Sequence, residues 1–428
     1  MSASRTPVIL GRVIAGAGFA AILAITLTPS PASAPLAART PITCLVCGAH
    51  GAIDVTLNVL LFVPLGFGLR LAGTPPRRAL ALAVVTTLGV ETLQLGLIPG
   101  RDASLSDPLT NTAGAFLGIL AARHWRGWLL PGPARSLHLA LVAAAAWLAV
   151  WIGTASLVVP SLPRTMYWGQ WAPELAHLAR FEGTVLRAQL EGRELPKGRI
   201  DESPRLRDDL LDGRLLLTAT AVAAGPTERL APIVSVFDEN EQEILLLGQD
   251  ETDLVFRFRT RASDVRLRTP AVTLAGVLAD AAGDTLALTA ELAGSRYRLR
   301  AASRRVAAEV ELAPGPGWGW ALLTPLEDYA IGTGHRLLTA LWTAGLLLPV
   351  GYWAGRARRR AAPLAAGLAA ILGLTAAPLL HGLPVSHWSE WLAAAVGLAV
   401  GRLAGRWGSG GREVDEPAPA VGRPHAAA

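Results

Sequence analysis

Eight long apolar runs constrain this chain more than any other feature of its sequence. Each holds roughly 18 to 25 residues, the length of an α-helix that crosses the hydrocarbon core of a bilayer. The predicted spans cover residues 7–29, 53–72, 78–98, 105–123, 136–160, 327–353, 361–381 and 388–406. A composition of 51% hydrophobic and 17% charged residues agrees with an integral membrane protein in contact with the lipid bilayer.

Clusters of arginine mark the ends of these runs. They comprise Arg5 and Arg12; Arg70, Arg77 and Arg78; Arg123, Arg126 and Arg135; residues 356–360; and Arg402 and Arg406. The clusters fall at every second connection, so the positive-inside rule predicts an even number of spans and two cytoplasmic termini. Short clusters between apolar runs are typical of topology signals, and no nucleic-acid partner is expected.

The first run has two interpretations. Basic residues, an apolar core and "PASA" at Pro31 to Ala34 resemble the cleavage region of a signal peptide. Pro35 would follow the cut, however, and signal peptidase disfavours proline there. We therefore expect the first run to remain as a membrane anchor.

Residues 161–322 contain no apolar run of spanning length. Alternating runs such as "LVFRFRTR" and "RYRLRAA", separated by turn signals such as "FDENEQ" and "AAGDT", predict strands with one buried face. The expected fold class is therefore an α-helical polytopic membrane protein with an inserted extracytoplasmic antiparallel β-sandwich.

The expected domain limits follow from these patterns. Residues 1–160 hold five helices, residues 161–322 the jelly-roll-like sandwich, and residues 323–407 three further helices. Residues 408–428 are rich in Gly, Pro and Ala, and we expect a disordered cytoplasmic tail because they carry too little apolar surface to offset the entropy of ordering.

Polar side chains gather at the outer ends of the second and third predicted helices. In "DVTLNVLLFVPLG", Asp54 and Asn58 share one helix face in the first turns of the second span. The third span starts inside, so a rise of about 1.5 Å per residue puts Glu91 and Gln94 about 20 to 24 Å further out. These four side chains should lie near one level.

The fourth span adds more polar groups at that level. Its sequence starts "GRDASLSDPLTNTAGAFLG", with Arg101 in the loop and Asp107 and Asn111 on one helical stripe. Asp54 and Asp107 could instead cap their helices, Asp107 by standing before Pro108. The asparagines could also be structural hydrogen-bond links between helices.

Three motifs together resemble the VanZ-like membrane family. The family pattern has an Asn before Phe-x-Pro-Leu-Gly, then Glu-x-x-Gln, an Arg, and an Asp before Asn-Thr-x-Gly. The matching positions are Asn58, Phe62, Pro64, Leu65, Gly66, Glu91, Gln94, Arg101, Asp107, Asn111, Thr112 and Gly114. The resemblance covers about residues 7–125. It implies a bacterial cell-envelope protein, in a family whose named member is linked to resistance to the glycopeptide antibiotic teicoplanin.

The middle region is more loosely similar to laminin-G-like or concanavalin-like jelly rolls, which often bind glycans. The similarity lies in the strand pattern of "RLAPIVSVFDENEQEILLLGQDETDLVFRFRTRA". Trp168, Trp171, Trp318 and Trp320 could stack on sugar rings. The alternative, core or interface aromatics close to the membrane, is favoured.

The last spans hint at a second copy of the fourth span. Shifting "DPLTNTAGAFLG" by 283 residues places it on "EWLAAAVGLAVG", which pairs Asp107 with Glu390 and two glycines with Gly397 and Gly401. Chance similarity between two helices rich in Ala and Gly is the alternative. Glu390, His381 and His387 would also lie at the outer face.

Cys44 and Cys47 form a C-x-x-C motif in the first outer loop. That compartment is oxidising, so a short-loop disulfide is expected. A redox-active pair is a second interpretation, although no thioredoxin-like context surrounds it. A zinc site would need two further ligands, of which only His50 is nearby. No metal or cofactor is predicted.

The leading functional hypothesis is an outward-facing pocket that binds or modifies an envelope lipid or glycan precursor. Glu91 or Asp107 would be the titratable group and, in an enzyme, the acid or base. Arg101 would hold an anionic group, while Asp54, Asn58, Gln94 and Asn111 would complete the pocket. The alternative is a non-enzymatic glycan-binding sensor or scaffold. A transporter is least favoured, because the charges cluster at one face rather than near the midplane.

Overall fold

The computed structural model describes residues 5–28, 43–46, 48, 50–97, 104–175, 178–324, 334–357, 359 and 361–410. The long helices are α1 (Arg5–Thr26), α2 (Gly51–Leu71), α3 (Pro76–Leu97), α4 (Ser106–Arg123), α6 (Pro133–Leu157), α10 (His335–Arg356), α11 (Ala361–Leu380) and α12 (Trp388–Gly410). Each overlaps one of the eight apolar runs. The proposed cleavage region and almost all of the predicted tail lie outside the described residues.

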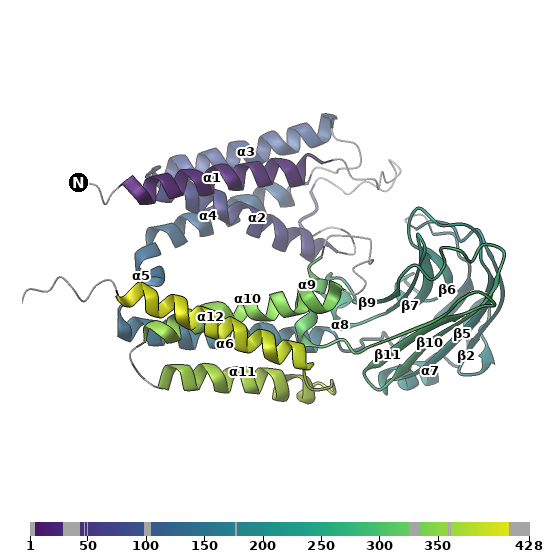
Figure 1. Ribbon diagram of the computed structural model, residues 1–428. Helices are drawn as coiled ribbons and strands as arrows, with labels where there is room; N and C mark the ends of the chain where they lie inside the picture. Colours follow the sequence, from purple (N-terminus) through teal and green to yellow (C-terminus); the bar gives the residue numbers. More distant parts are fainter. Residues whose placement is uncertain are drawn as a thin grey trace, which may run out of the picture.

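The helices form two groups (Figure 1). The first group holds α1 to α4, and the second holds α6, α10, α11 and α12. The short helix α5 (Trp125–Leu129) connects them at one end, where the indole of Trp353 donates a hydrogen bond of 2.6 Å to the Trp128 carbonyl. The expected domain limits put α6 with the first four helices, whereas it packs against α10 and α11.

Backbone contact through glycine sets the packing of the first group. A Cβ atom added to Gly114 of α4 would lie 2.1 Å from the Val59 carbonyl oxygen of α2, and one added to Gly66 of α2 would lie 2.0 Å from the Ala115 carbonyl oxygen. Helix α1 packs on α2 in the same manner, since a Cβ atom at Gly68 would lie 2.4 Å from the Ala15 nitrogen. Small residues thus let these helices approach more closely than larger side chains permit.

The second group repeats this packing between α10 and α12. A Cβ atom on Gly397 would lie 2.4 Å from the Ala344 carbonyl oxygen, and one on Gly351 would lie 2.3 Å from the Leu398 carbonyl oxygen. The facing pairs are Val59–Gly114, Val63–Gly118 and Gly66–Ala115 in the first group, and Ala344–Gly397, Leu348–Gly401 and Gly351–Leu398 in the second.

The two sets of pairs share a constant register. Positions in α2 and α10 differ by 285 residues, as from Pro64 to Pro349, and positions in α4 and α12 differ by 283, as from 107 to 390. Three facing contacts in one register agree with the second-copy interpretation for this pair of helices. Helices α10 and α12 thus pack as α2 and α4 do, whereas α11 packs mainly on α6 and α3 packs mainly on α4.

Two antiparallel sheets form the β domain. One sheet has the order β4 (Gly198–Ile200), β1 (Tyr167–Trp171), β6 (Ala231–Asp238), β7 (Glu243–Asp250), β8 (Asp253–Phe258) and β9 (Ala271–Leu274). The other has the order β12 (Ala307–Leu312), β11 (Arg296–Ala302), β10 (Thr285–Ala293), β5 (Arg214–Val222), β2 (Thr184–Leu190) and β3 (Arg193–Glu194). Short helices α7 (Ser203–Leu211), α8 (Arg261–Asp264) and α9 (Gly319–Leu322) flank them.

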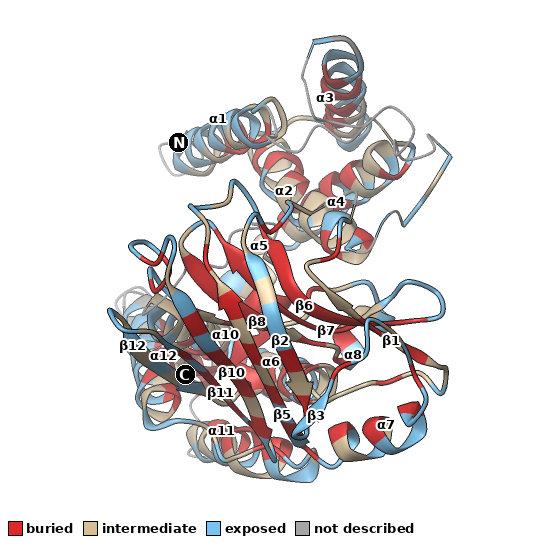
Figure 2. Ribbon diagram, turned by 90° about the vertical axis from the view of Figure 1, so that its right-hand side faces the viewer, coloured by how far each residue is buried: buried red, intermediate tan, exposed pale blue. Residues whose placement is uncertain are grey.

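Hydrophobic side chains from both sheets meet in one core that includes Leu217, Ile233, Phe256 and Leu299. Strands of the second sheet alternate between buried and exposed residues, whereas β6 is buried along its whole length (Figure 2). The predicted turn at "FDENEQ" connects β6 to β7, and the Asp238 carboxylate accepts the backbone N–H groups of Asn240 and Gln242 there. The period-2 runs in the sequence therefore correspond to real strands.

Six helices in the described part of the chain are long and apolar enough to cross a membrane. They are α1, α2, α3, α6, α10 and α11. The chain is thus a multi-pass membrane protein with a β domain. Helices α4 and α12 pack along α2 and α10, but they are not among these six long, apolar helices. The expectation of eight spans therefore stays a prediction.

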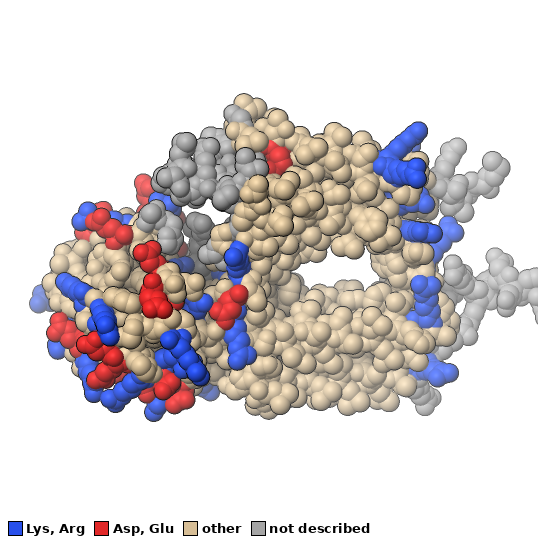
Figure 3. Space-filling model, turned by 180° about the vertical axis from the view of Figure 1, so that it is seen from behind, with Lys and Arg blue, Asp and Glu red and all other residues tan. Residues whose placement is uncertain are grey.

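Charged side chains are distributed unevenly along the helices (Figure 3). On the face shown, Lys and Arg gather at the helix ends opposite the β domain, and the middle of the helices carries almost no charge. Arg70, Arg123 and Arg356 occupy the last turns of α2, α4 and α10. Figure 3 also shows an opening between the two groups of helices.

This distribution generates a topology prediction. Reporter fusions after residues 74, 130 and 410 should read as cytoplasmic, and fusions after residues 50, 103 and 250 as extracytoplasmic, because arginine is retained on the cytoplasmic side. Paired alkaline phosphatase and fluorescent protein fusions measure this. A cytoplasmic signal after residue 250 would place the β domain on the other side and contradict the orientation.

The glycine contacts generate a stability prediction. Gly114→Ala should destabilise the protein by about 1–3 kcal/mol, because the added methyl group forces α4 away from α2. Gly89→Ala in α3 is the matched control, since a Cβ atom there meets nothing within 4 Å. Thermal unfolding in detergent measures both variants. Equal melting temperatures would show that the close approach does not limit stability.

Candidate functional site

Asn58 and Asp107 connect α2 to α4 at the end of the helices nearer the β domain. The Asn58 side-chain amide donates a hydrogen bond of 2.8 Å to the Asp107 Oδ1 atom. Both side chains are half-buried. The glycine contacts one and two turns deeper bring the backbones close enough for this short pair of side chains to meet.

Glu91 of α3 joins the same group. Glu91 is 8% exposed as a whole residue, and its carboxyl group lies within hydrogen-bonding reach of the Asp107 carboxyl group. The backbone N–H of Ser104, just before α4, donates a hydrogen bond of 3.1 Å to Glu91 Oε2. Two carboxyl groups in contact are most stable when they share one proton, an arrangement also used for acid/base chemistry.

Asn111 and Thr87 extend the group one helical turn deeper. The Asn111 amide nitrogen donates a hydrogen bond of 2.9 Å to the Thr87 hydroxyl oxygen, and both residues are buried. Asn111 Oδ1 has no hydrogen-bond partner among the described residues. If the amide were turned over, the nitrogen would be left without one. We call Asn58, Thr87, Glu91, Asp107 and Asn111 the polar cluster.

Gln94 contacts a different neighbour. Its amide nitrogen donates a hydrogen bond of 2.9 Å to the carbonyl of Thr26, at the end of α1, and its buried Oε1 atom has no partner in the described part of the chain. The donor therefore links α1 to α3. The orphaned oxygen remains available to a water molecule or a ligand.

Asp54 and Arg101 are not placed in the polar cluster by any described contact. Asp54 is exposed in the first turn of α2, one turn before Asn58. Arg101 lies outside the described residues, three positions before Ser104 in the sequence. Their roles in ligand binding stay predictions.

Asp107 does not cap helix α4. Helix α4 begins at Ser106 with Leu105 at the N-cap position, and no side-chain hydrogen bond caps it. Asp107 lies inside the first turn and contacts α2 and α3 instead. Asp54 is not an N-cap either, because His50 holds that position in α2.

Cys44 is disulfide-bonded, and Cys47 lies outside the described residues. A sulfur atom in a disulfide offers no thiolate to a metal ion, but an external thiolate can still attack it in thiol–disulfide exchange. A structural role for this disulfide stays a prediction.

The tryptophans considered for sugar stacking occupy two places. In the β domain, Trp171 donates a hydrogen bond of 3.1 Å to the Leu195 carbonyl, and the Lys197 ammonium group lies 4.4 Å from the centre of its ring. Trp318 is buried where the β domain meets the helices, and Trp320 donates to the Thr339 hydroxyl of α10. These two act as interface aromatics.

Thr87 and Ser104 are cluster contacts that the sequence motifs did not indicate. Thr87 precedes Glu91 by four residues, so helical spacing alone puts both on one face of α3. Ser104 contributes a backbone N–H, which no side-chain pattern reveals.

Comparison with known proteins agrees with the motif pattern. Residues 17–126 match the family model described as VanZ/LLP1. The match runs from α1 into α5 and contains every residue of the polar cluster. No curated protein and no solved structure matches the chain. Residues 17–126 of this multi-pass membrane protein form a VanZ-like domain.

Proposed function

We propose that this chain is a bacterial cell-envelope protein whose polar cluster binds an envelope lipid or glycan precursor from the outer side. The VanZ-like domain supports the envelope assignment. The arginine-rich helix ends support cytoplasmic termini in the inner membrane and an extracytoplasmic β domain.

The observation that carries the proposal is the meeting of Asn58, Glu91 and Asp107 from three helices. Polar groups at membrane depth need partners, because an unsatisfied group there costs several kcal/mol. Two buried acceptors near this level, Asn111 Oδ1 and Gln94 Oε1, lack a donor within the described residues. The hydroxyl or amide groups of a head group would supply such donors.

Charge suggests how the ligand is held. Arg101 stands three positions before Ser104 in the sequence, and the Ser104 backbone N–H donates to Glu91. We assign Arg101 to an anionic phosphate or carboxylate of the ligand, since guanidinium groups bind such anions in bidentate fashion. If the ligand is also modified, the Glu91–Asp107 pair would exchange the proton.

A second candidate function is a non-enzymatic sensor or scaffold. Two hydrogen bonds between helices favour it, Gln94 to Thr26 and Asn111 to Thr87, because such bonds also serve as structural links in membrane bundles. In this version the β domain binds the glycan or a partner protein. The two functions differ in what the loss of one polar group does to stability.

The first test replaces charges in the proposed pocket. Glu91→Gln and Arg101→Ala should each lower ligand affinity by about tenfold or more, the loss expected for a hydrogen bond to a charged group. Teicoplanin susceptibility of a complemented deletion strain and the lipids that copurify with the protein measure this. Thr92→Val is the control, because Thr92 is exposed and its hydroxyl group donates to the Leu88 carbonyl of its own helix.

Melting temperature separates the two functions in this test. If the cluster is a binding pocket, the Glu91 and Arg101 variants should melt at the wild-type temperature but fail to restore the teicoplanin phenotype. If the cluster is purely structural, their melting temperature should fall, and that loss of stability should account for the phenotype. Glu91 and Arg101 variants that match the wild-type protein in both measurements would refute the pocket.

The second test compares amides with the exposed carboxylate. Asn58→Leu and Asn111→Leu should impair ligand binding and destabilise the fold by about 1–3 kcal/mol each, because Asp107 and Thr87 lose their donor. Asp54→Asn should impair ligand binding less than either of these substitutions, because Asp54 is exposed in the first turn of α2. The same copurification and unfolding assays apply. A larger effect of Asp54→Asn would contradict the proposed roles.

A further inference from the structure

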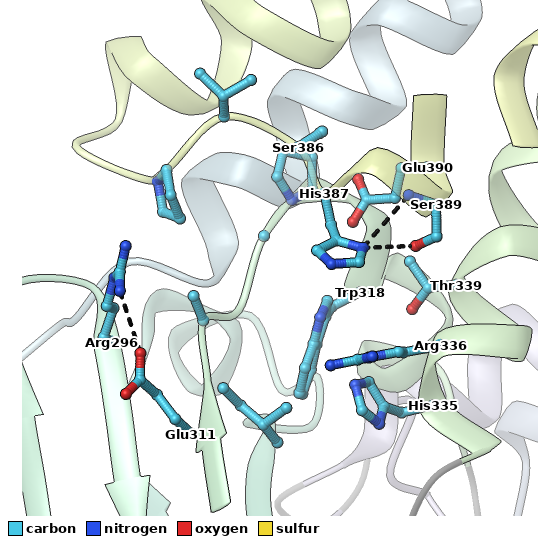
Figure 4. A pocket seen from close by; sticks show the side chains of 16 residues that line it. Arg296, Glu311, Trp318, His335, Arg336, Thr339, Ser386, His387, Ser389 and Glu390 are labelled. Atoms are coloured by element: carbon cyan, nitrogen blue, oxygen red, sulfur yellow. Dashed lines mark hydrogen bonds and ion pairs between the residues drawn. The ribbon is translucent and has the colours of Figure 1, made fainter. Parts of the chain in front are cut away.

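The second group of helices carries a cavity at the end that corresponds to the polar cluster. Glu390 lies in the first turn of α12, as Asp107 lies in the first turn of α4, and the two helices match through the register of their glycines. The cavity has a volume of about 310 Å³ and is shown in Figure 4. This volume is at the lower end of the range for small-molecule sites.

Three parts of the chain line this cavity. The β domain contributes Arg296 and Glu311, which pair with each other at 3.2 Å, and the segment that leaves it contributes Trp318. Helix α10 contributes His335 and Arg336 at its N-terminus. The segment before α12 and its first turn contribute Ser386, His387, Ser389 and Glu390.

Glu390 is the main acceptor of the cavity. The residue is 6% exposed, and Figure 4 shows its carboxylate on the same side as Ser386 and His387. The Ser386 hydroxyl group and the backbone N–H of His387 both lie near the Glu390 carboxyl group, yet Glu390 Oε2 and Ser386 Oγ have no hydrogen-bond partner of acceptable geometry among the described residues. A buried carboxylate oxygen without a donor is costly. A ligand with hydroxyl groups would satisfy it.

Gly317 packs directly against Glu390. A Cβ atom there would lie 2.9 Å from the Glu390 Cδ atom and 2.6 Å from the Thr339 Cγ2 atom. The segment that leaves the β domain therefore lies directly against the Glu390 carboxyl group. This contact fixes the carboxylate between the β domain and the helices.

The opposite part of the cavity is positively charged. Arg336 is exposed and lies next to His335, whose ring centre is 5.8 Å from that of Trp318. Burial, followed by the nearby charges of Arg336 and His335, lowers the pKa of His387. The N-termini of α10 and α12 add their positive dipole ends.

We propose that this cavity is a second binding site, for a hydroxyl-bearing phosphate such as a glycerol phosphate group. Arg336 and the helix N-termini hold the phosphate. The Glu390 carboxylate accepts hydrogen bonds from the hydroxyl groups of the ligand, and the Ser386 hydroxyl group donates to them. The site lies at the ends of the apolar helices nearer the β domain, the level of lipid head groups. The same chemistry occurs in phosphatidylglycerol and in free glycerol phosphate.

The test uses the full-length protein in nanodiscs of phosphatidylcholine that contain either phosphatidylglycerol or phosphatidic acid. Native mass spectrometry measures which lipid stays bound to the protein after the protein is released from the nanodisc. The wild-type protein should retain phosphatidylglycerol about tenfold better than phosphatidic acid, which has the phosphate without the hydroxyl groups. Soluble glycerol 1-phosphate, compared with inorganic phosphate by thermal shift, identifies a free ligand as the source instead.

Variants assign this preference to the cavity. Glu390→Gln should remove the discrimination between the two lipids, and Arg336→Ala should weaken retention of both. Arg304→Ala, an exposed arginine between β11 and β12 outside the cavity, is the control and should behave as wild type. If Glu390→Gln does not fold, Ser386→Ala should show the same loss of discrimination.

Two results would overturn the proposal. One is a wild-type protein that prefers neither phosphatidylglycerol nor glycerol 1-phosphate over its control. The other is a pair of folded Glu390→Gln and Arg336→Ala variants that retain phosphatidylglycerol as the wild-type protein does.

Discussion

The close contact between α2 and α4 governs the first half of this protein. Gly114 and Gly118 of α4 face the carbonyl groups of Val59 and Val63, and Gly66 of α2 faces Ala115. Without Cβ atoms at these points the two backbones touch, and the short side chains of Asn58 and Asp107 can meet. The polar cluster is thus a consequence of helix packing that only glycine permits.

Helices α10 and α12 keep the packing of α2 and α4 but carry different polar side chains. Position 343, equivalent to Asn58, is a buried threonine whose hydroxyl group donates to its own helix at Thr339. Position 394, equivalent to Asn111, is alanine. Glu390 stands at the position equivalent to Asp107, and it lines a cavity together with Pro316 and Trp318. The same helix packing therefore places an acidic side chain at the equivalent point of both helix pairs.

The β domain occupies a defined place in the chain. It is inserted between α6 and α10, and both of its connections lie at the same end of the bundle. Backbone hydrogen bonds join it to the helices there, from Arg261 to Val159 and from Arg268 to Leu322. The domain must therefore lie over the end that holds the polar cluster and the cavity.

The sequence by itself determined the elements, because apolar runs, period-2 runs and turn residues act over a few neighbouring positions. The helices, the strands of the sandwich and the turn at Asp238 follow from such local patterns, and the three motifs identified the VanZ-like region. Tertiary structure decided the rest. Only packing shows that α6 belongs with α10, that Asp107 contacts Asn58 rather than capping α4, and that Ser104 donates to Glu91. The cavity joins Trp318, Arg336 and Glu390 from separate segments, and such a long-range arrangement leaves no periodic signal in the chain.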